Sequence, residues 1–303
     1  MPGGDTGVAR WCDHLRVRHL YECQLRWADQ DMLGHVNNVL YLDYLQEARV
    51  DLFRVHAPDL RAPEFGEGLV VVRHDITYVS PLVFSFKPAY VETWVSDIRA
   101  ASFTLDHEIF SLDEDQGRIV HVRARSVLTP FDFTADRPRR LSAPERAVLG
   151  DLLEQGEELA ALPVAPPIAM PGDDYRVGVR FSDLDVYRHV NNVTYFEYFQ
   201  ESRIKLMREL GRGLHAKGLD MVVARTRVDY LAPMLHRAEP YDCPSWIGRL
   251  GRTSVSYESL VREGDRVLAR ANVIAVCVSS QTHRPLALPT ELRERVEPLL
   301  AQA

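Results

Sequence analysis

The chain has 303 residues, of which 46% are hydrophobic and 26% are charged, a composition typical of globular proteins. Its length predicts about two domains, each long enough to bury a core of its own. The formal net charge of −7 argues against nucleic acid as the main partner, because phosphate binding needs clustered Lys and Arg. The sequence has no apolar run of about 18 residues, which predicts no membrane span, and its start lacks the order of a signal peptide.

The first elements predicted along the chain are a leader, a strand and a helix. Residues 1–18 are expected to form the leader, and the alternating residues 19–27 the strand. After an Asp-rich turn, a helix is expected to begin near Asn37 or Asn38, since Asn is a strong N-cap residue, and to end before Pro58. Apolar residues at helical spacing form its buried stripe: Tyr41, Leu45, Ala48, Leu52 and Val55.

Beyond this helix the hydrophobic period changes to two, which predicts strands. Consecutive strands joined by short turns form an antiparallel sheet, and one long apolar helix packed on it is the simplest two-layer arrangement. The fold class predicted for each half is therefore α+β. The expected strands are 69–80, 88–98, 102–111 and 117–129, and again 220–231, 240–250, 253–262 and 265–278.

The turn and the helix occur twice. RWADQDMLGHVNNVLYLDYLQEAR at 26–49 and RFSDLDVYRHVNNVTYFEYFQESR at 180–203 align without a gap, and 13 of the 24 positions are identical. A repeat 154 residues apart indicates two whole domains, because the units of solenoid proteins are much shorter. Several identical positions are polar, and burial alone does not account for them.

A linker is predicted between the two copies. Residues 142–162 are expected to form a connecting helix, because Ser142 and Glu145 make a capping box at its start. The Pro-rich residues 163–171 are expected to run as a semi-rigid segment. The predicted division is a leader at 1–18, a domain at 19–140, a linker at 141–172 and a second domain at 173–303.

The four cysteines indicate neither a metal centre nor a disulfide framework. None has CxxC spacing or pairing with His, so we interpret them as free thiols in a reducing cytoplasm. The sequence therefore predicts a cytoplasmic protein that binds no metal. The cysteines are Cys12, Cys23, Cys243 and Cys277.

The polar part of the repeat lies directly before a helix, where N–H groups lack intrahelical partners. Asp31 and Asp185 precede the helix in the two copies. A carboxylate there can activate water or attack a carbonyl carbon, while the N–H groups hold the oxyanion of a tetrahedral intermediate. This arrangement suits hydrolysis of an activated carbonyl, and the sequence offers neither a Ser or Cys nucleophile elbow nor a metal cluster.

The pattern Asp-x-Asp-x-x-Gly-His-Val-Asn-Asn-x-x-Tyr-(x)5-Glu-x-Arg resembles that of the hotdog-fold acyl-CoA thioesterases of the 4-hydroxybenzoyl-CoA thioesterase type. It is also similar to the acyl-carrier-protein thioesterases, which share the HVNN element. The two copies extend the resemblance from about residue 19 to 298. It implies two tandem hotdog domains, each an antiparallel sheet wrapped around one long helix. The two domains would form an intramolecular pseudo-dimer with active sites at their interface.

The resemblance also implies roles for eight residues and requires no cofactor. Asp31 and Asp185 would be the catalytic carboxylates, and the N–H groups at Asn38 and Asn192 would polarise the thioester carbonyl. The residues implied to line the sites and bind substrate are His35, Asn37, His189 and Asn191. Whether the two histidines act as hydrogen-bond partners or as acid and base stays open.

Three positions depart from the family pattern. The plant acyl-carrier-protein enzymes carry Asn two residues after the aspartate, where this chain has Leu33 and Tyr187. Several bacterial members carry His where this chain has Asn38 and Asn192, so a His-assisted mechanism is not expected. The position of Gly34 is taken by Arg188 in the second copy, which would narrow that site or add a phosphate contact.

Other polar residues of the repeat are interpreted as structural. Asp29 and Asp183 are expected to accept backbone N–H bonds in a turn. Arg49 and Arg203 have no acidic neighbour on their own helix, so we hypothesise that they pair with Asp29 and Asp183.

The predicted function is hydrolysis of an acyl-CoA to a free carboxylic acid and CoA, within fatty acid metabolism in the cytoplasm. Neither a nucleic acid partner nor a membrane span is expected. Homo-oligomers of the pseudo-dimer agree with the resemblance, because such pairs often associate further. The alternatives are an acyl-carrier-protein thioesterase and a non-catalytic protein that binds acyl thioesters.

Overall fold

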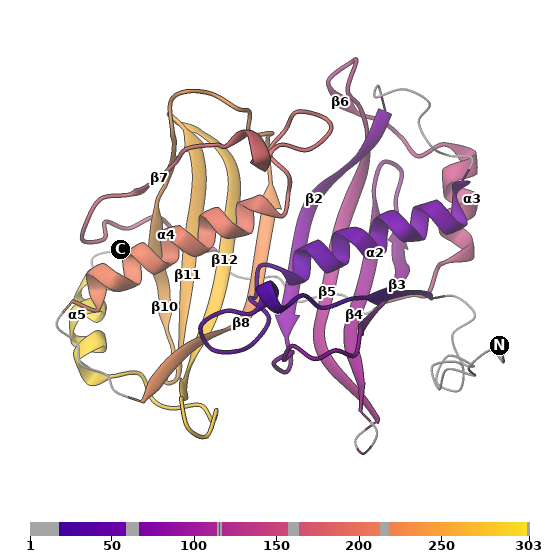
Figure 1. The fold of residues 1–303 in the computed structure, drawn as a ribbon. Helices are drawn as coiled ribbons and strands as arrows, with labels where there is room; N and C mark the ends of the chain where they lie inside the picture. The colour runs from indigo at the N-terminus through magenta and orange to yellow at the C-terminus, as the bar shows by residue number, and fades with distance from the viewer. Residues whose placement is uncertain are drawn as a thin grey trace.

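The computed structural model describes residues 18–58, 67–113, 115, 117–156, 164–212 and 218–301. The described residues form one 12-stranded sheet in the order β1-β3-β4-β5-β2-β8-β12-β11-β9-β7, with β6 paired to β5 and β10 to β11. The pairs between these strands are antiparallel. Figure 1 shows the two halves side by side, with one long helix in front of each.

The first half begins with β1 (His19–Cys23), the short 3-10 helix η1 (Trp27–Asp29) and helix α2 (Tyr41–His56). The strands that follow are β2 (Glu67–Tyr78), β3 (Ala89–Ile98), β4 (Phe103–Asp113), β5 (Gly117–Asp132) and the two-residue β6 (Arg137–Pro138). Each consecutive pair from β3 to β5 is a hairpin, as the period-two pattern predicts.

The second half repeats this order with β7 (Tyr175–Val177), η3 (Phe181–Asp183) and α4 (Thr194–Leu210). Its strands are β8 (Leu219–Tyr230), β9 (Tyr241–Cys243), β10 (Ser245–Leu250), β11 (Ser254–Glu263) and β12 (Arg266–Ser279), and α5 (Thr290–Leu300) follows. The strand expected at 240–250 is split in two at Pro244, which has no N–H to donate to a neighbouring strand.

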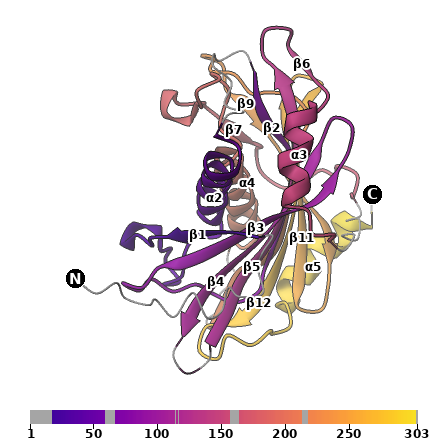
Figure 2. The ribbon, with the colours of Figure 1, turned by 90° about the vertical axis from the view of Figure 1, so that its right-hand side faces the viewer.

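The two long helices lie on the same side of the sheet (Figure 2), and α3 (Ala143–Asp151) packs near the end of α2, where its Leu149 joins a buried cluster with Leu52. The helices adopt this position because one face of each is apolar. Leu45, Ala48 and Leu52 of α2 are at most 1% exposed, and Tyr195 and Phe199 of α4 are equally part of the core. The predicted α+β fold, with a sheet wrapped around one helix in each half, is confirmed.

The halves join through β2 and β8, the innermost strand of each. Five consecutive residue pairs connect them, from Arg73 opposite Asp229 to Thr77 opposite Arg225. On one face of this seam, the Arg225 guanidinium donates to both carboxylate oxygens of Asp75 at 2.8 and 2.7 Å. The continuous backbone pairing makes the tandem repeat an intramolecular pseudo-dimer.

Three details of the predicted elements are wrong. Helix α2 begins at Tyr41 rather than near Asn38, because 38–40 form a separate turn before it. Val55 is 47% exposed, since the last turn of α2 extends beyond the sheet-facing stripe. The connecting helix ends at Asp151, and its predicted part at 157–162 falls outside the described residues.

The connecting helix is shorter than predicted because the chain after it pairs with a strand of the sheet. After α3 the chain runs beside β3, beyond the residues of β3 that pair with β1. There the Val95 N–H donates to the Leu152 carbonyl, and the Glu154 N–H donates to the Val95 carbonyl. These bonds with β3 replace the bonds that would have continued the helix, and tertiary pairing outweighs local propensity here.

Cys23, Cys243 and Cys277 are buried and free, as expected, whereas Cys12 and the predicted leader up to residue 17 lie outside the described residues. Among the described helices, none is long and apolar enough to cross a membrane.

Candidate functional site

The turn before each long helix is anchored by a buried aspartate. Asp29 is 2% exposed and accepts hydrogen bonds from the Arg26 N–H at 2.9 Å, the Arg26 Nε at 2.9 Å and the Tyr44 hydroxyl at 2.6 Å. Its carbonyl accepts the Asn37 N–H at 2.8 Å. Asp29 therefore ties the turn to both the preceding chain and α2, which supports the structural role that the sequence analysis gave it.

The second half repeats this anchor. Asp183 is 3% exposed and accepts from the Arg180 N–H, the Arg180 Nε and the Tyr198 hydroxyl at 2.8, 3.0 and 2.7 Å. The hypothesis that Arg49 and Arg203 pair with these aspartates is wrong. The arginine that bonds each aspartate lies three residues before it in the chain.

Asp31 lies on a tight loop that folds back towards α2. The Asp31 N–H donates to the His35 carbonyl at 2.8 Å, and one Asp31 carboxylate oxygen accepts the Leu33 N–H at 2.8 Å. Gly34 adopts φ 77°, in the left-handed region that glycine enters without steric cost. The loop thus holds the carboxylate by one oxygen, while no hydrogen bond to the other oxygen occurs among the described residues.

Asp185 occupies the same loop in the second half. One of its carboxylate oxygens accepts the Tyr187 N–H at 2.9 Å and the His189 N–H at 3.2 Å. Burial raises the pKa of Asp185, and these two N–H bonds act in the opposite direction. Arg188 adopts φ 63° where the first copy has Gly34, so the backbone is strained at this one position.

The turn between each aspartate loop and its helix presents a free N–H group. Asn37 accepts the Val39 N–H through its side chain at 3.1 Å and the Leu40 N–H through its carbonyl at 3.0 Å. The N–H of Asn38 makes no hydrogen bond within the described part of the chain. Because it precedes α2, it is the donor that an incoming oxyanion would meet.

The same turn recurs before α4. The side chain of Asn191 accepts the Val193 N–H at 3.2 Å, and the N–H of Asn192 again has no acceptor among the residues that the structure describes. A tyrosine from the sheet fixes each turn. The Tyr78 hydroxyl donates a hydrogen bond to the Asn38 carbonyl, and the Tyr230 hydroxyl donates one to the Asn192 carbonyl, each at 2.7 Å.

These tyrosines are site residues that the sequence reasoning missed. Tyr78 and Tyr230 stand 152 residues apart and identify the register of the repeat, a signal that could have shown their importance. Each tyrosine lies some forty residues after its motif in the sequence, so the sequence alone does not show that it contacts the turn. Gln46 was missed in the same way, because its side-chain oxygen accepts from the Asn192 side chain across the two halves at 3.5 Å.

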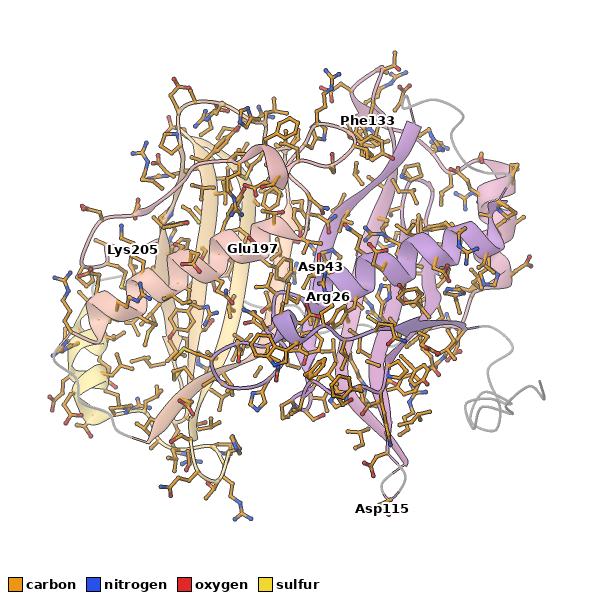
Figure 3. All side chains as sticks on the ribbon, in the orientation of Figure 1. Arg26, Asp43, Asp115, Phe133, Glu197 and Lys205 are labelled. Carbon is orange, nitrogen blue, oxygen red and sulfur yellow. The ribbon has the colours of Figure 1, made fainter. Side chains whose placement is uncertain are left out.

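The two histidines of the motif face the opposite half. The ring of His35 lies 6.0 Å from that of His283, which follows β12. The ring of His189 lies 5.7 Å from Phe133, and Phe133 in turn stacks on Tyr187 at 4.1 Å with nearly parallel planes. Phe133 is labelled at the top of the first half in Figure 3. Each aspartate loop is thus bordered by a segment from the other half.

A surface hollow of about 460 Å³ lies between the turn before α2 and the first residues of the second half. Asn37 and Leu40 line it from one side, and Arg180, Glu197 and Glu201 from the other. Figure 3 shows Glu197 and Asp43 near the middle of the molecule, where the two helices begin. Neither Asp31 nor Asp185 lines this hollow. The hollow is therefore a groove beside the aspartate loops, and the two carboxylates do not face into it.

The eight residues singled out in the sequence form two equivalent groups, one before each long helix. Each group combines a carboxylate, a free N–H group and a tyrosine that fixes the turn, with the other half alongside. A carboxylate and a free N–H group on the same short segment are the groups that acyl transfer to water requires, the first for water or the carbonyl carbon and the second for developing negative charge.

Comparison with known proteins identifies the family of the chain. Residues 25–158 and 179–296 each match the Thioesterase-like superfamily. The long-chain acyl-CoA thioesterase FadM of Escherichia coli is 29% identical over 129 residues, which are 41% of this chain and 97% of FadM. The uncharacterized protein YsmA of Bacillus subtilis is 33% identical over 121 residues, 39% of this chain and 81% of YsmA.

Solved structures share the complete two-domain fold. The 12:0-ACP thioesterase of Umbellularia californica superposes with a TM-score of 0.69 at 14% identity. The match covers 86% of this chain and 94% of the Umbellularia chain. An acyl-ACP thioesterase of Bacteroides thetaiotaomicron superposes with a TM-score of 0.61 at 16% identity. The match covers 85% of this chain and 97% of the Bacteroides chain. The chain belongs to the thioesterase-like superfamily, as a protein with two tandem hotdog domains.

Proposed function

We propose that the protein hydrolyses acyl-CoA thioesters to a free carboxylic acid and CoA at two sites, one before each long helix. The observation that carries the proposal is the free N–H of Asn38 and of Asn192, each beside an aspartate loop. The similarity to a long-chain acyl-CoA thioesterase supports CoA as the carrier. We further propose a cytoplasmic location, a part in fatty acid metabolism, and domains at 19–140 and 173–303.

In the proposed reaction, the thioester carbonyl oxygen accepts a hydrogen bond from the N–H of Asn38 or Asn192. This bond strengthens as the oxygen becomes negative in the transition state. The carboxylate of Asp31 or Asp185 either removes a proton from the attacking water or attacks the carbonyl carbon itself. In the first route, the C–S bond of the tetrahedral intermediate breaks to give the acid, and the proton taken from water passes to the leaving sulfur of CoA. In the second route, the C–S bond breaks to give an acyl-aspartyl anhydride and the CoA thiolate, and a water then hydrolyses the anhydride and supplies the proton for the thiolate.

The other residues position these groups. Tyr78 and Tyr230 donate hydrogen bonds to the carbonyls of Asn38 and Asn192 and so hold the turns that carry the two N–H groups. His35, Asn37, His189 and Asn191 border the loops and are proposed to contact the substrate. Arg188 is exposed next to Asp185 and offers a positive charge to the phosphates of CoA.

The test is the release of free thiol from acyl-CoAs of different chain length by wild type, Asp31→Asn, Asp185→Asn and the double variant. Two working sites predict a partial loss in each single variant and a complete loss in the double variant. A loss caused by one substitution alone would leave a single working site. If the folded wild type released no thiol from any acyl-CoA, hydrolysis of CoA esters would be excluded, and acyl-carrier-protein esters would be the next substrates to assay.

A further inference from the structure

The outer edge of the sheet is covered by the chain itself in the first half. There β1 pairs with β3 only along residues 89–93, so the rest of β3 has no strand of the sheet on that side. The chain after α3 takes this place and runs parallel to β3 at Val95. The Val95 N–H donates to the Leu152 carbonyl at 2.9 Å, and the Val95 carbonyl accepts the Glu154 N–H at 2.8 Å.

The corresponding edge of the second half is open. β10 pairs with β11 on one side, and Ile247 of β10 is the counterpart of Val95. The register is the same in both halves, because Val95 lies opposite Leu105 and Ile247 lies opposite Tyr257. The N–H and carbonyl of Ile247 therefore point out of the sheet edge, as those of Val95 do. No described residue outside the pair of β10 and β11 bonds to either group.

The irregularity in β10 does not prevent pairing at this edge. β10 has a bulge between Ile247 and Arg249, and bulges can protect an edge from other chains. β3 has one at the same place, between Val95 and Asp97, and yet it pairs with the chain after α3. An open edge presents unpaired N–H and carbonyl groups, to which another extended chain can bond. The edge at Ile247 is therefore able to accept a strand.

A groove of about 290 Å³ lies at this edge, beside α5 (Figure 1). Its lining is mostly apolar and includes Ile247, Ile168 before β7 and Leu300 of α5. The chain before β7 crosses one face of the sheet at Gly248, where a Cβ would lie 2.9 Å from that of Ala165. This chain borders the groove but does not pair with the edge of β10.

The groove contains one cation without a counterion. Arg249 is exposed and lines the groove, and it forms no ion pair with the residues that the structure describes. Glu297 lines the groove as well, but its carboxylate lies 3.4 Å from the Arg293 guanidinium on the same helix. The groove therefore favours an occupant that brings a negative charge to Arg249.

The segment that covers β3 shows which side chains suit such an edge. Leu152 is 4% exposed and belongs to a buried cluster with Leu52 of α2. Glu154, two residues later, accepts a hydrogen bond from the Arg18 Nε at 2.9 Å. The segment thus combines a buried apolar side chain with a carboxylate that meets an arginine.

We propose that the edge of β10 binds an extended segment of a partner protein, in which an acidic residue stands two positions after a leucine. The segment adds one strand parallel to β10. The N–H of Ile247 donates to the leucine carbonyl, and the carbonyl of Ile247 accepts the N–H of the acidic residue. The leucine packs beside Ile168 and Leu300, and the carboxylate pairs with Arg249. The charge of the groove and the example of residues 152–154 select this partner.

The probe is a fluorescently labelled peptide with the sequence of residues 149–155, and fluorescence anisotropy measures its binding to the full chain. We expect saturable binding to wild type. Arg249→Glu should weaken binding about 10-fold or more, because attraction becomes repulsion. A peptide with Lys in place of its Glu should bind Arg249→Glu better than it binds wild type. Asp97→Asn, at the matching position of the covered edge, should leave the affinity unchanged.

Two methylated peptides test the strand pairing without any change to the protein. A methyl group on the backbone nitrogen of the glutamate removes the N–H that would bond to Ile247, and it should weaken binding about 10-fold. In the covered edge the Leu153 N–H bonds to Gly150 and not to β3. A methyl group on that nitrogen should therefore leave binding unchanged. Equal effects of the two methyl groups would overturn the proposal, and so would a wild type that does not bind the peptide.

A second copy of the chain is the alternative occupant of the edge. If two copies paired through β10, the protein alone would form a dimer, and the peptide would dissociate it. Size-exclusion chromatography with light scattering measures this, and such a result would show that the proposal of a separate partner is wrong. Neither measurement depends on the proposed hydrolysis of acyl-CoA.

Discussion

The sheet of the second half contains a carboxyl group whose titration should be visible in the stability of the protein. Glu258 on β11 is 4% exposed and accepts a hydrogen bond from the Asn272 side chain at 2.5 Å. In the first half the matching cross-strand pair is Asp106 with Arg125, joined by two bonds of 2.6 Å. The second half thus has an amide where the first has a cation, and burial raises the pKa of Glu258 to about 7.

The raised pKa of Glu258 determines how the stability of the protein changes with pH. The folded state holds the proton of Glu258 up to about pH 7, whereas the unfolded chain loses it near the ordinary value of 4.5. The stabilising contribution is therefore complete below about pH 4.5 and is lost as the pH rises towards 7. A shift of about two and a half units corresponds to about 3 kcal/mol of unfolding free energy at most.

Glu258→Gln should remove this pH dependence and make the protein more stable than wild type at about pH 8. The glutamine amide keeps an oxygen for Asn272 and adds a donor to a site where the Asn272 side-chain oxygen has no partner among the described residues. The measurement is urea unfolding between about pH 5 and 8, with the exposed Glu294→Gln as the control. Parallel pH profiles for Glu258→Gln and wild type would refute the assignment of a neutral carboxyl at this position.

Two further predictions concern the turns before the long helices. Tyr44→Phe should cost about 1 to 3 kcal/mol of unfolding free energy, because buried Asp29 then loses one of its hydrogen bonds. Urea unfolding measures this, and an unchanged midpoint would contradict the anchoring role of Asp29. Arg188→Gly should stabilise the protein by about 1 kcal/mol, since Arg188 lies at positive φ. It should also raise KM for acyl-CoA but not for the matching acyl-pantetheine, and equal KM changes would exclude a phosphate contact.

The sequence predicts the fold well because each strand in it carries its own signal. The period-two pattern identifies β2 to β5 and their repeats, and the similarity of 26–49 to 180–203 identifies two equivalent halves. It does not predict that β2 pairs with β8, because the backbone groups that form this seam are the same in every strand.

The candidate site is predictable only where its parts lie close together in the chain. The motif contains Asp31 and Asn38, and the loop between them is closed by the Asp31 N–H, which donates to the His35 carbonyl. Tyr78, which fixes the same turn, comes from the sheet and carries no motif of its own. Arg49 illustrates the limit: helical spacing shows that it lacks an acidic neighbour on α2, but not that Asp29 is already bonded by Arg26, three residues before it in the chain.

The two halves differ in a way that separates reaction from substrate choice. Residues that are identical between the copies, such as Asp31 with Asp185 and Tyr78 with Tyr230, hold the carboxylate and the N–H donor at each helix. The sheet residues that face the helices diverge, as His107 does from its counterpart serine. Catalysis of thioester cleavage needs only the first set, whereas an acyl chain contacts the second. A duplicated protein of this kind can therefore keep one reaction at both sites while each half selects a different acyl group.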